Sequence, residues 1–245
     1  GLDDPTALFV SGNELFVAKN DGSQIQVFSA SANGNVAPLR TISGVNTNID
    51  DPRGVIVFNN EIFVGNENAT ITVYPVGASG NVAPTRTIAG VNTQLGVVDN
   101  LLVFNNELYV TTEDVGRVLV FPVTANGDVA PTRNLSGVNT LLDGPIDIAI
   151  DGNELFVASF TTGAIRVFNV NATGNVAPLR SLSGGNTGLT SAFGLTIRSG
   201  ELFVTDFNNN RISVFDRNAS GDVAPLRTIS GVATLLSGPW GIFIP

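Results

Sequence analysis

The chain has 245 residues, of which 43% are hydrophobic, and a formal net charge of −9 at pH 7. Cys, His and Met are absent, which excludes thiol nucleophiles, Ser-His-Asp triads, Cys/His zinc sites and imidazole bases and favours a binding protein over an enzyme. No apolar run approaches the ~20 residues needed to cross a bilayer, and the acidic balance predicts no binding to nucleic acid and no insertion into membranes.

Two short motifs recur along the whole chain. Gly-Asn/Asp-Val-Ala-Pro begins at Gly34, Gly80, Gly127, Gly174 and Gly221, so that successive copies lie 46 or 47 residues apart. Glu-Leu-Phe-Val, or a near variant, begins at Glu14, Glu61, Glu107, Glu154 and Glu201. This periodicity divides the chain into five repeats, approximately 4–50, 51–97, 98–144, 145–191 and 192–238, followed by a terminal segment 239–245.

Each repeat is expected to form four short strands, a to d. In the first repeat, strand a is Ala7–Val10, strand b begins at Glu14, strand c is Ile25–Phe28 and strand d is Pro38–Ile42. Gly/Asn turns between strands a and b are hairpin signals. Strand c recurs at Ile71–Tyr74, Val118–Phe121, Ile165–Phe168 and Ile212–Phe215.

Strands a and b carry apolar residues at consecutive positions, as in Leu155–Ala158. Such strands are covered on both faces, because a half-solvated strand would alternate with polar residues. Small sheets that are covered on both faces and repeated along a chain stack around an axis. The sequence therefore predicts one all-β domain over 1–245, a five-bladed β-propeller of four-stranded antiparallel blades. A six-bladed propeller with an incomplete blade is the alternative.

The fifth repeat carries a family resemblance. It contains Gly194-Leu-Thr-Ile-Arg, Glu201-Leu-Phe-Val-Thr-Asp, Asn208-Asn-Asn-Arg-Ile-Ser-Val-Phe-Asp and Leu226-Arg-Thr-Ile. These segments closely resemble an NHL repeat, and the earlier repeats fit more loosely. The resemblance implies a propeller of the NHL and lactonase-like superfamily. That superfamily includes adaptors, receptors, lyases and metal-dependent hydrolases, so the resemblance does not select a function.

Some residues are the same in every repeat and are interpreted as scaffold. A Glu opens each strand b, and each strand d carries an Arg, namely Arg40, Arg86, Arg133, Arg180 and Arg227. We expect these arginines to be shielded and bonded to a carboxylate or to loop carbonyls in at least four blades, because a binding site rarely needs five identical groups.

The loops between strands b and c differ from repeat to repeat, whereas the c–d loops are nearly identical. In propellers the b–c and d–a loops share one face, and the divergent face is the candidate binding face. The candidate ligand-binding residues on this face are Arg53, Glu113, Asp114, Phe160, Asp206, Phe207 and Trp240. The expected partner is a protein or a glycan.

Residues that lead into strand a should approach the central axis. There Asp99, Asn100 and Asp147 could supply oxygen ligands for Ca²⁺. Lactonase-like relatives hold a metal in that region with a Glu/Asn/Asp set, but this chain lacks the Glu and has Arg53 nearby. A calcium-dependent hydrolase or lyase of lactonase type is therefore the alternative function.

Strand a is expected six times, since Gly241–Ile244 repeats the pattern of the earlier copies, whereas strands b, c and d are expected five times. Both chain ends therefore compete for the inner position of the first blade. An intramolecular latch is favoured over donation to a second molecule because tethering raises effective concentration. Strand donation would instead build a surface polymer.

Abundant Asn, Thr, Ser and Gly with a single Lys, Lys19, predicts a secreted or cell-surface protein.

Overall fold

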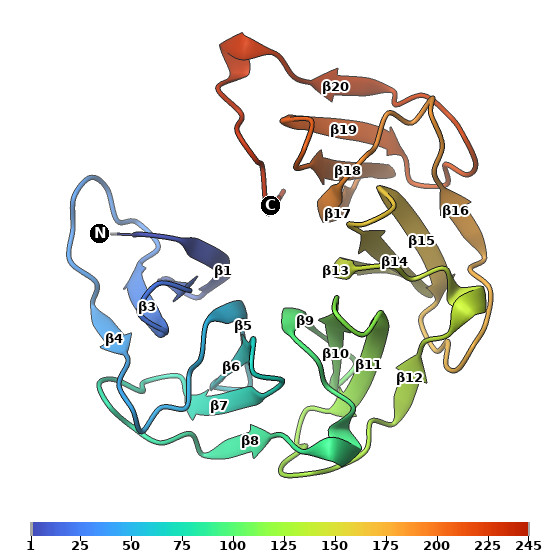
Figure 1. The fold of residues 1–245 in the computed structure, drawn as a ribbon. Helices are drawn as coiled ribbons and strands as arrows, with labels where there is room; N and C mark the ends of the chain where they lie inside the picture. The colour runs from blue at the N-terminus through green and yellow to red at the C-terminus, as the bar shows by residue number, and fades with distance from the viewer. Residues whose placement is uncertain (1, 245) are drawn as a thin grey trace. The chain divides into compact units, whose positions relative to one another are not determined.

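The computed structural model describes residues 2–244. The fold is all-β, with five blades of four antiparallel strands arranged as a β-propeller (Figure 1). Among the described residues, helix is confined to three short 3-10 turns, Val91–Thr93, Val138–Thr140 and Val232–Thr234. None of the helices in the described residues is long and apolar enough to cross a membrane. The predicted five-bladed architecture is confirmed, and no sixth sheet forms among residues 2–244.

Strands follow one another through each blade in chain order, from strand a to strand d. The first blade contains β1 (Pro5–Ser11), β2 (Glu14–Lys19), β3 (Gln24–Ser29) and β4 (Arg40–Ile42), and the second β5 (Pro52–Phe58), β6 (Glu61–Asn66), β7 (Ile71–Pro75) and β8 (Arg86–Ile88). The third contains β9 (Val98–Phe104), β10 (Glu107–Thr112), β11 (Arg117–Pro122) and β12 (Arg133–Leu135). The fourth contains β13 (Pro145–Asp151), β14 (Glu154–Ser159), β15 (Ala164–Asn169) and β16 (Arg180–Leu182), and the fifth β17 (Ala192–Arg198), β18 (Glu201–Asp206), β19 (Arg211–Asp216) and β20 (Arg227–Ile229).

The chain forms two compact units. The first runs to Val110 and includes Val120–Thr132, and the second comprises Thr111–Leu119 and the chain from Arg133 onward. The core of each unit joins apolar side chains from neighbouring blades, such as Phe16 with Val55 in the first unit and Phe156 with Leu195 in the second. This packing explains why strands a and b are apolar at consecutive positions. The single domain expected over 1–245 stays a prediction.

In the second to fifth blades, the Gly-Asn/Asp motif links the blade to the one before it. Gly80, in the second blade, donates its N–H to Thr41 O over 2.7 Å and accepts from Ser43 N over 3.2 Å. Its φ of +74° is a conformation that favours glycine. The next side chain, Asn81, accepts from Asn46 N over 2.8 Å. The same contacts recur between the fourth and fifth blades through Gly221 and Asp222, at the equivalent positions of the motif.

The strand-d arginines hold neighbouring blades together. Arg40, Arg86 and Arg180 are shielded, and each pairs with the Glu that opens strand b of its own blade. Each also donates to a backbone carbonyl in the next blade. Arg133 reaches the next blade through Asn171 Oδ1 over 2.8 Å. Arg227 pairs with Glu201, but its side chain is half exposed. The expected bonding is thus confirmed, with the shielding weakest in the fifth blade.

The two ends of the chain differ in structure. β1 pairs with β2 along its length and is the inner strand of the first blade. The expected terminal strand is not formed in residues 239–244, and Pro245 lies outside the described residues. Instead, Trp240 O accepts a hydrogen bond from Thr205 Oγ1 over 2.8 Å, as Ile146 O in β13 does from Thr111. The terminal segment therefore occupies the place of a following strand a, but the described residues give it no strand b to pair with.

Candidate functional site

The b–c loops lie directly beside the d–a loops, as expected for one face of a propeller. In the fourth blade, Phe160 N donates to Gly144 O over 2.8 Å, and in the fifth, Phe207 N donates to Ser191 O over 3.0 Å. In the second blade, Glu67 N donates to Asp50 O over 3.1 Å. Within each unit, the loops that diverge between repeats therefore form a common surface.

Four aromatic side chains in the second unit meet on this surface, and we call them the aromatic cluster: Phe160, Phe193, Phe207 and Trp240. Phe193 is the centre, with ring centroids 5.4 Å from Phe160, 5.4 Å from Phe207 and 4.2 Å from Trp240. Phe207 and Trp240 also meet edge to face at 6.0 Å. These separations are typical of stabilising aromatic pairs. Three of the seven ligand-binding candidates are thus brought together around Phe193.

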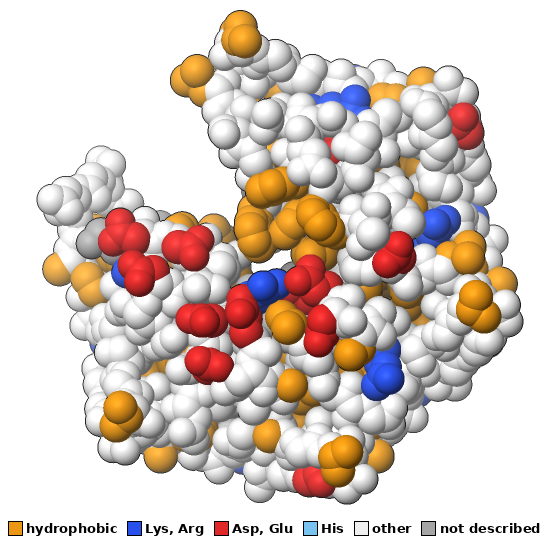
Figure 2. Space-filling model, in the orientation of Figure 1, with side chains coloured by type: hydrophobic (Ala, Val, Ile, Leu, Met, Phe, Trp, Pro, Cys, Tyr) orange, Lys and Arg blue, Asp and Glu red, His pale blue; other side chains and the backbone are white. Residues whose placement is uncertain are grey.

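The aromatic cluster has a buried base and an exposed edge. Phe193 is 5% exposed, whereas Trp240 is 42% exposed. Figure 2 shows a hydrophobic patch over β17 and the C-terminal segment. Packed aromatic rings lose little conformational entropy when a partner covers them, because neighbouring rings already fix their orientation. The cluster can therefore bury further apolar surface against another molecule at low entropic cost.

Asp206 supports the loops around the aromatic cluster. The residue is fully buried, and its carboxylate accepts from Ser191 N over 3.1 Å and from Asn209 Nδ2 over 2.8 Å. Arg211 pairs with the same carboxylate at 2.8 Å. These contacts fix the turn between β18 and β19 to the loop before β17. The structure therefore places Asp206 beneath the surface, as a support for Phe207.

A charged group in the first unit surrounds Arg53. Its Nε donates to Glu67 Oε1 over 2.7 Å, and its Nη1 donates to Asp99 Oδ1 over 2.9 Å. Burial alone would lower the pKa of Arg53, but the hydrogen bonds to Asp99 and Glu67 outweigh it and raise that pKa. Arg53 is therefore a fixed cation whose charge is balanced by two carboxylates.

The proposed calcium ligands have other partners. Asp99 pairs with Arg53, and Asn100 follows it in β9. Asp147 accepts from Ile148 N over 2.8 Å and from Leu195 N over 2.7 Å, and burial raises the pKa of this carboxyl to about 7. No group of three or more Asp and Glu residues suited to a metal ion occurs within 2–244. The guanidinium of Arg53 already engages the Asp99 carboxylate, which disfavours Ca²⁺ at this residue. The calcium site stays a prediction.

Glu113 and Asp114 lie in the turn between β10 and β11. The sequence predicted that both residues lie on the face of the b–c and d–a loops but did not predict their contacts. It also passed over Arg166, a buried arginine in β15. A signal was available, because the corresponding positions of the other strands c carry Gln26, Thr72, Leu119 and Ser213. Arg166 is the charged exception in that set.

No protein-family model and no curated protein sequence matches this chain. Among solved structures, it is similar to the WD40 β-propeller domain of Doa1, with a TM-score of 0.67 and 16% sequence identity over 94% of this chain and 70% of that chain. It is also similar to the computationally designed Ika8 protein, with a TM-score of 0.60 and 15% identity over 98% of this chain and 78% of that chain. At these identities the likeness shows the β-propeller fold alone. The resemblance to NHL repeats stays an interpretation of the sequence.

Proposed function

We propose that this protein is a non-catalytic binding module that recognises a protein partner through the face formed by its b–c and d–a loops. One observation carries the proposal, namely the aromatic cluster with Trp240 42% exposed above a packed base. Partly exposed aromatic residues in well-packed surroundings are typical of the positions that dominate binding energy. A propeller presents such loops from a rigid scaffold, which preserves their arrangement when the partner binds.

A protein partner is favoured over a glycan by the arrangement of the rings. Trp240 meets Phe193 at an interplanar angle of 57° and Phe207 at 88°. The cluster therefore presents ring edges and an irregular apolar surface, not a flat platform on which a sugar ring could stack. We propose Arg53, Glu113 and Asp114 as polar contacts contributed by the corresponding loops. An extracellular or cell-surface location is supported by composition, and detection of the protein in the culture medium of its source cells would test it.

The test is selection of binders from a displayed library of protein fragments, followed by calorimetry with purified partners. Trp240→Ala should weaken binding of a selected partner by about tenfold or more. Phe243→Ala is the matched control, because Phe243 is an exposed aromatic residue of the same terminal segment outside the aromatic cluster. Equal affinities of the Trp240→Ala variant and the wild type, or binding to a glycan array alone, would contradict the proposal.

A further inference from the structure

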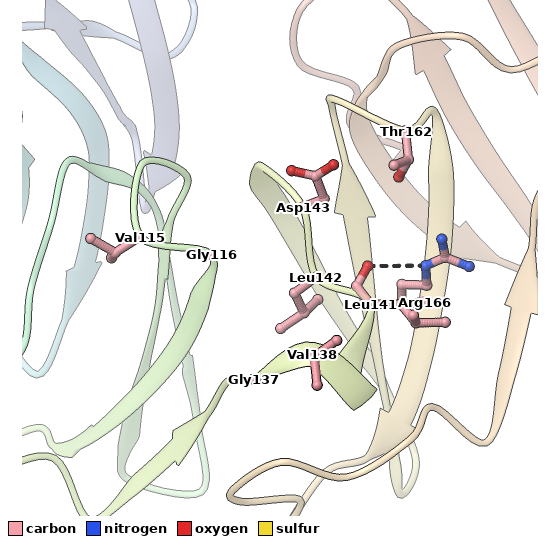
Figure 3. Close-up of a pocket in the computed structure, with 9 residues that line it drawn as sticks. All are labelled: Val115, Gly116, Gly137, Val138, Leu141, Leu142, Asp143, Thr162 and Arg166. Atoms are coloured by element: carbon pink, nitrogen blue, oxygen red, sulfur yellow. Dashed lines mark hydrogen bonds between the residues drawn. The ribbon is translucent and has the colours of Figure 1, made fainter.

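Arg166 lies in the middle of β15, and its side chain is almost completely buried. The residue is 8% exposed and pairs with Val157 of β14 and Ser181 of β16 in the fourth sheet. Its Nε donates to the backbone oxygen of Leu141 over 3.3 Å (Figure 3). Within residues 2–244 this is its one hydrogen bond, and no carboxylate pairs with it. The two outer nitrogens of the guanidinium are therefore unpartnered.

Other shielded arginines of the chain have a counter-charge. Arg40 pairs with Glu14, which raises the pKa of that arginine, and Arg211 pairs with Asp206. Burial lowers the pKa of Arg166, and no hydrogen bond from its guanidinium to a carboxylate opposes the effect. A buried cation without a counter-charge is costly. The cost indicates that Arg166 has a use other than stabilising the blade.

The blade itself does not require an arginine at this position. The equivalent residues in the other blades, Gln26, Thr72, Leu119 and Ser213, are all uncharged, and three of them are fully buried. Their strands pair in the same register, as Thr72 with Thr87 and Ser213 with Thr228 show. The charge at Arg166 is therefore a local feature of the fourth blade.

Arg166 lines a pocket of about 470 Å³ on the face formed by the b–c and d–a loops. Figure 3 shows the guanidinium with its outer nitrogens turned away from the Leu141 oxygen and with Thr162 on the same side. Apolar walls come from Val115, Val138, Leu141 and Leu142, and Asp143 adds one carboxylate. The side chain of Leu141 is 48% exposed. The backbone of this residue has a φ of +57°, which is a strained conformation for leucine.

We propose that this pocket binds a monoanionic carboxylate that carries an apolar group. The planar guanidinium can donate two parallel hydrogen bonds to a carboxylate. Leu141, Leu142 and Val138 would cover the apolar group. A doubly charged phosphate is disfavoured, because Asp143 and the net charge of −9 repel a second negative charge that a single arginine cannot balance. The pocket volume suits a small molecule or one side chain, and the proposal does not rest on the protein partner proposed above.

The test uses isocaproate as the probe, in calorimetry and in NMR titration of the isotopically labelled full chain without any partner. The neutral amide of isocaproate, acetate and inorganic phosphate are the comparison ligands. Wild-type protein should bind isocaproate at least about tenfold more tightly than each of the other three, which corresponds to about 1.4 kcal/mol. The perturbed backbone signals should include those of Leu141, Thr162 and Arg166.

The repeats supply matched variants that keep the fold. Arg166→Gln and Arg166→Leu introduce the residues found at the same position of the first and third blades, and each should weaken isocaproate binding by about tenfold or more. Leu141→Asn introduces the counterpart residue Asn48, which has the same positive φ, and should reduce affinity for isocaproate to that for acetate. Arg198→Gln removes the same charge from an exposed site and should leave binding unchanged.

Three results would overturn the proposal. They are no binding of isocaproate by the wild type, amide or phosphate binding as tight as that of isocaproate, and unchanged affinity in both Arg166 variants. If one Arg166 variant does not fold, the other variant and Leu141→Asn still decide the outcome, because they test the charge and the apolar wall separately.

Discussion

The guanidinium of Arg180 contacts the fourth and the fifth blade at once. Its Nη2 donates to Glu154 Oε2 over 2.9 Å and to the backbone oxygen of Arg217 over 3.1 Å. The group also lies over the ring of Phe156, 5.3 Å from the centroid. Arg227 makes the equivalent ion pair with Glu201, but its side chain is 52% exposed. The two arginines therefore make the same kind of ion pair at different exposures, 16% for Arg180 and 52% for Arg227, and Arg180 adds a contact with the fifth blade.

Replacing these two arginines separates that contact from the ion pair. Arg180→Ala should lower the free energy of unfolding by about 2 kcal/mol, because it leaves the loop carbonyl of Arg217 without its donor and leaves Glu154 paired with Arg217 alone. Arg227→Ala should have a much smaller effect, since an exposed ion pair contributes little. Urea unfolding of both variants measures the difference. Equal losses would show that the contact between blades adds nothing.

Asp147 connects the inner strands of the fourth and fifth blades through its carboxylate. Burial raises its pKa to about 7 from an ordinary value of 3.8, although backbone amides donate to it. The folded state therefore binds more protons than the unfolded state between about pH 4 and pH 7, and the contribution of this group to stability falls as the pH rises through that window. Above it the contribution is constant.

Asp147→Asn should remove this pH dependence. The stability of the wild type relative to the variant should fall with a slope of up to about 1.4 kcal/mol per pH unit between pH 4 and pH 7. Urea unfolding at a series of pH values gives the slope. Asp143→Asn, which removes an exposed charge nearby, is the control and should not reproduce the change. A difference between wild type and Asp147→Asn that is constant with pH would contradict the prediction.

At the scale of whole elements, the terminal segment acts as a cover for the fifth blade. The hydroxyl of Thr205 donates a hydrogen bond to Trp240 O. The oxygen of the same hydroxyl accepts a hydrogen bond from Gly194 N over 2.7 Å. A side chain on Gly194 would collide with Trp240 O, because a Cβ there would lie 2.5 Å from it. The segment thus fits closely against β17 and β18 without being a strand.

Truncation after Gly238 should therefore expose β17 and the aromatic cluster. Hydrogen exchange at β17 and β18 should accelerate, because the segment covers Phe193 and bonds to Thr205. β13 and β14 of the fourth blade are the internal control and should keep their protection. An unchanged rate of hydrogen exchange in β17 would show that the terminal segment does not protect this strand.

On the scale of the molecule, the repeats made the fold predictable and left most of the site undetermined. The periodic Gly and Glu motifs predicted the number of blades and the order of their strands, because each motif has a fixed structural role in every copy. Contacts such as those of Phe193 with Trp240 depend on packing between segments far apart in the sequence, which local patterns do not specify. The uncharged counterparts of Arg166 in the other repeats mark it as an exception, but the sequence alone does not show that this charge is buried.

The joint between consecutive blades carries a consequence for how such a chain can evolve. Two of the hydrogen bonds that join consecutive blades use only backbone atoms at the Gly motif and at strand d, and the side-chain contacts beside them come from motif residues and from the strand-d arginines, which recur with each repeat. A gene duplication of one 47-residue period therefore brings its own complete joint and fits after any existing copy without compensating substitutions. The number of repeats in the chain can change in a single recombination event. Recognition of a new ligand requires only substitutions in the loops. The number of blades and the ligand specificity can therefore evolve almost independently.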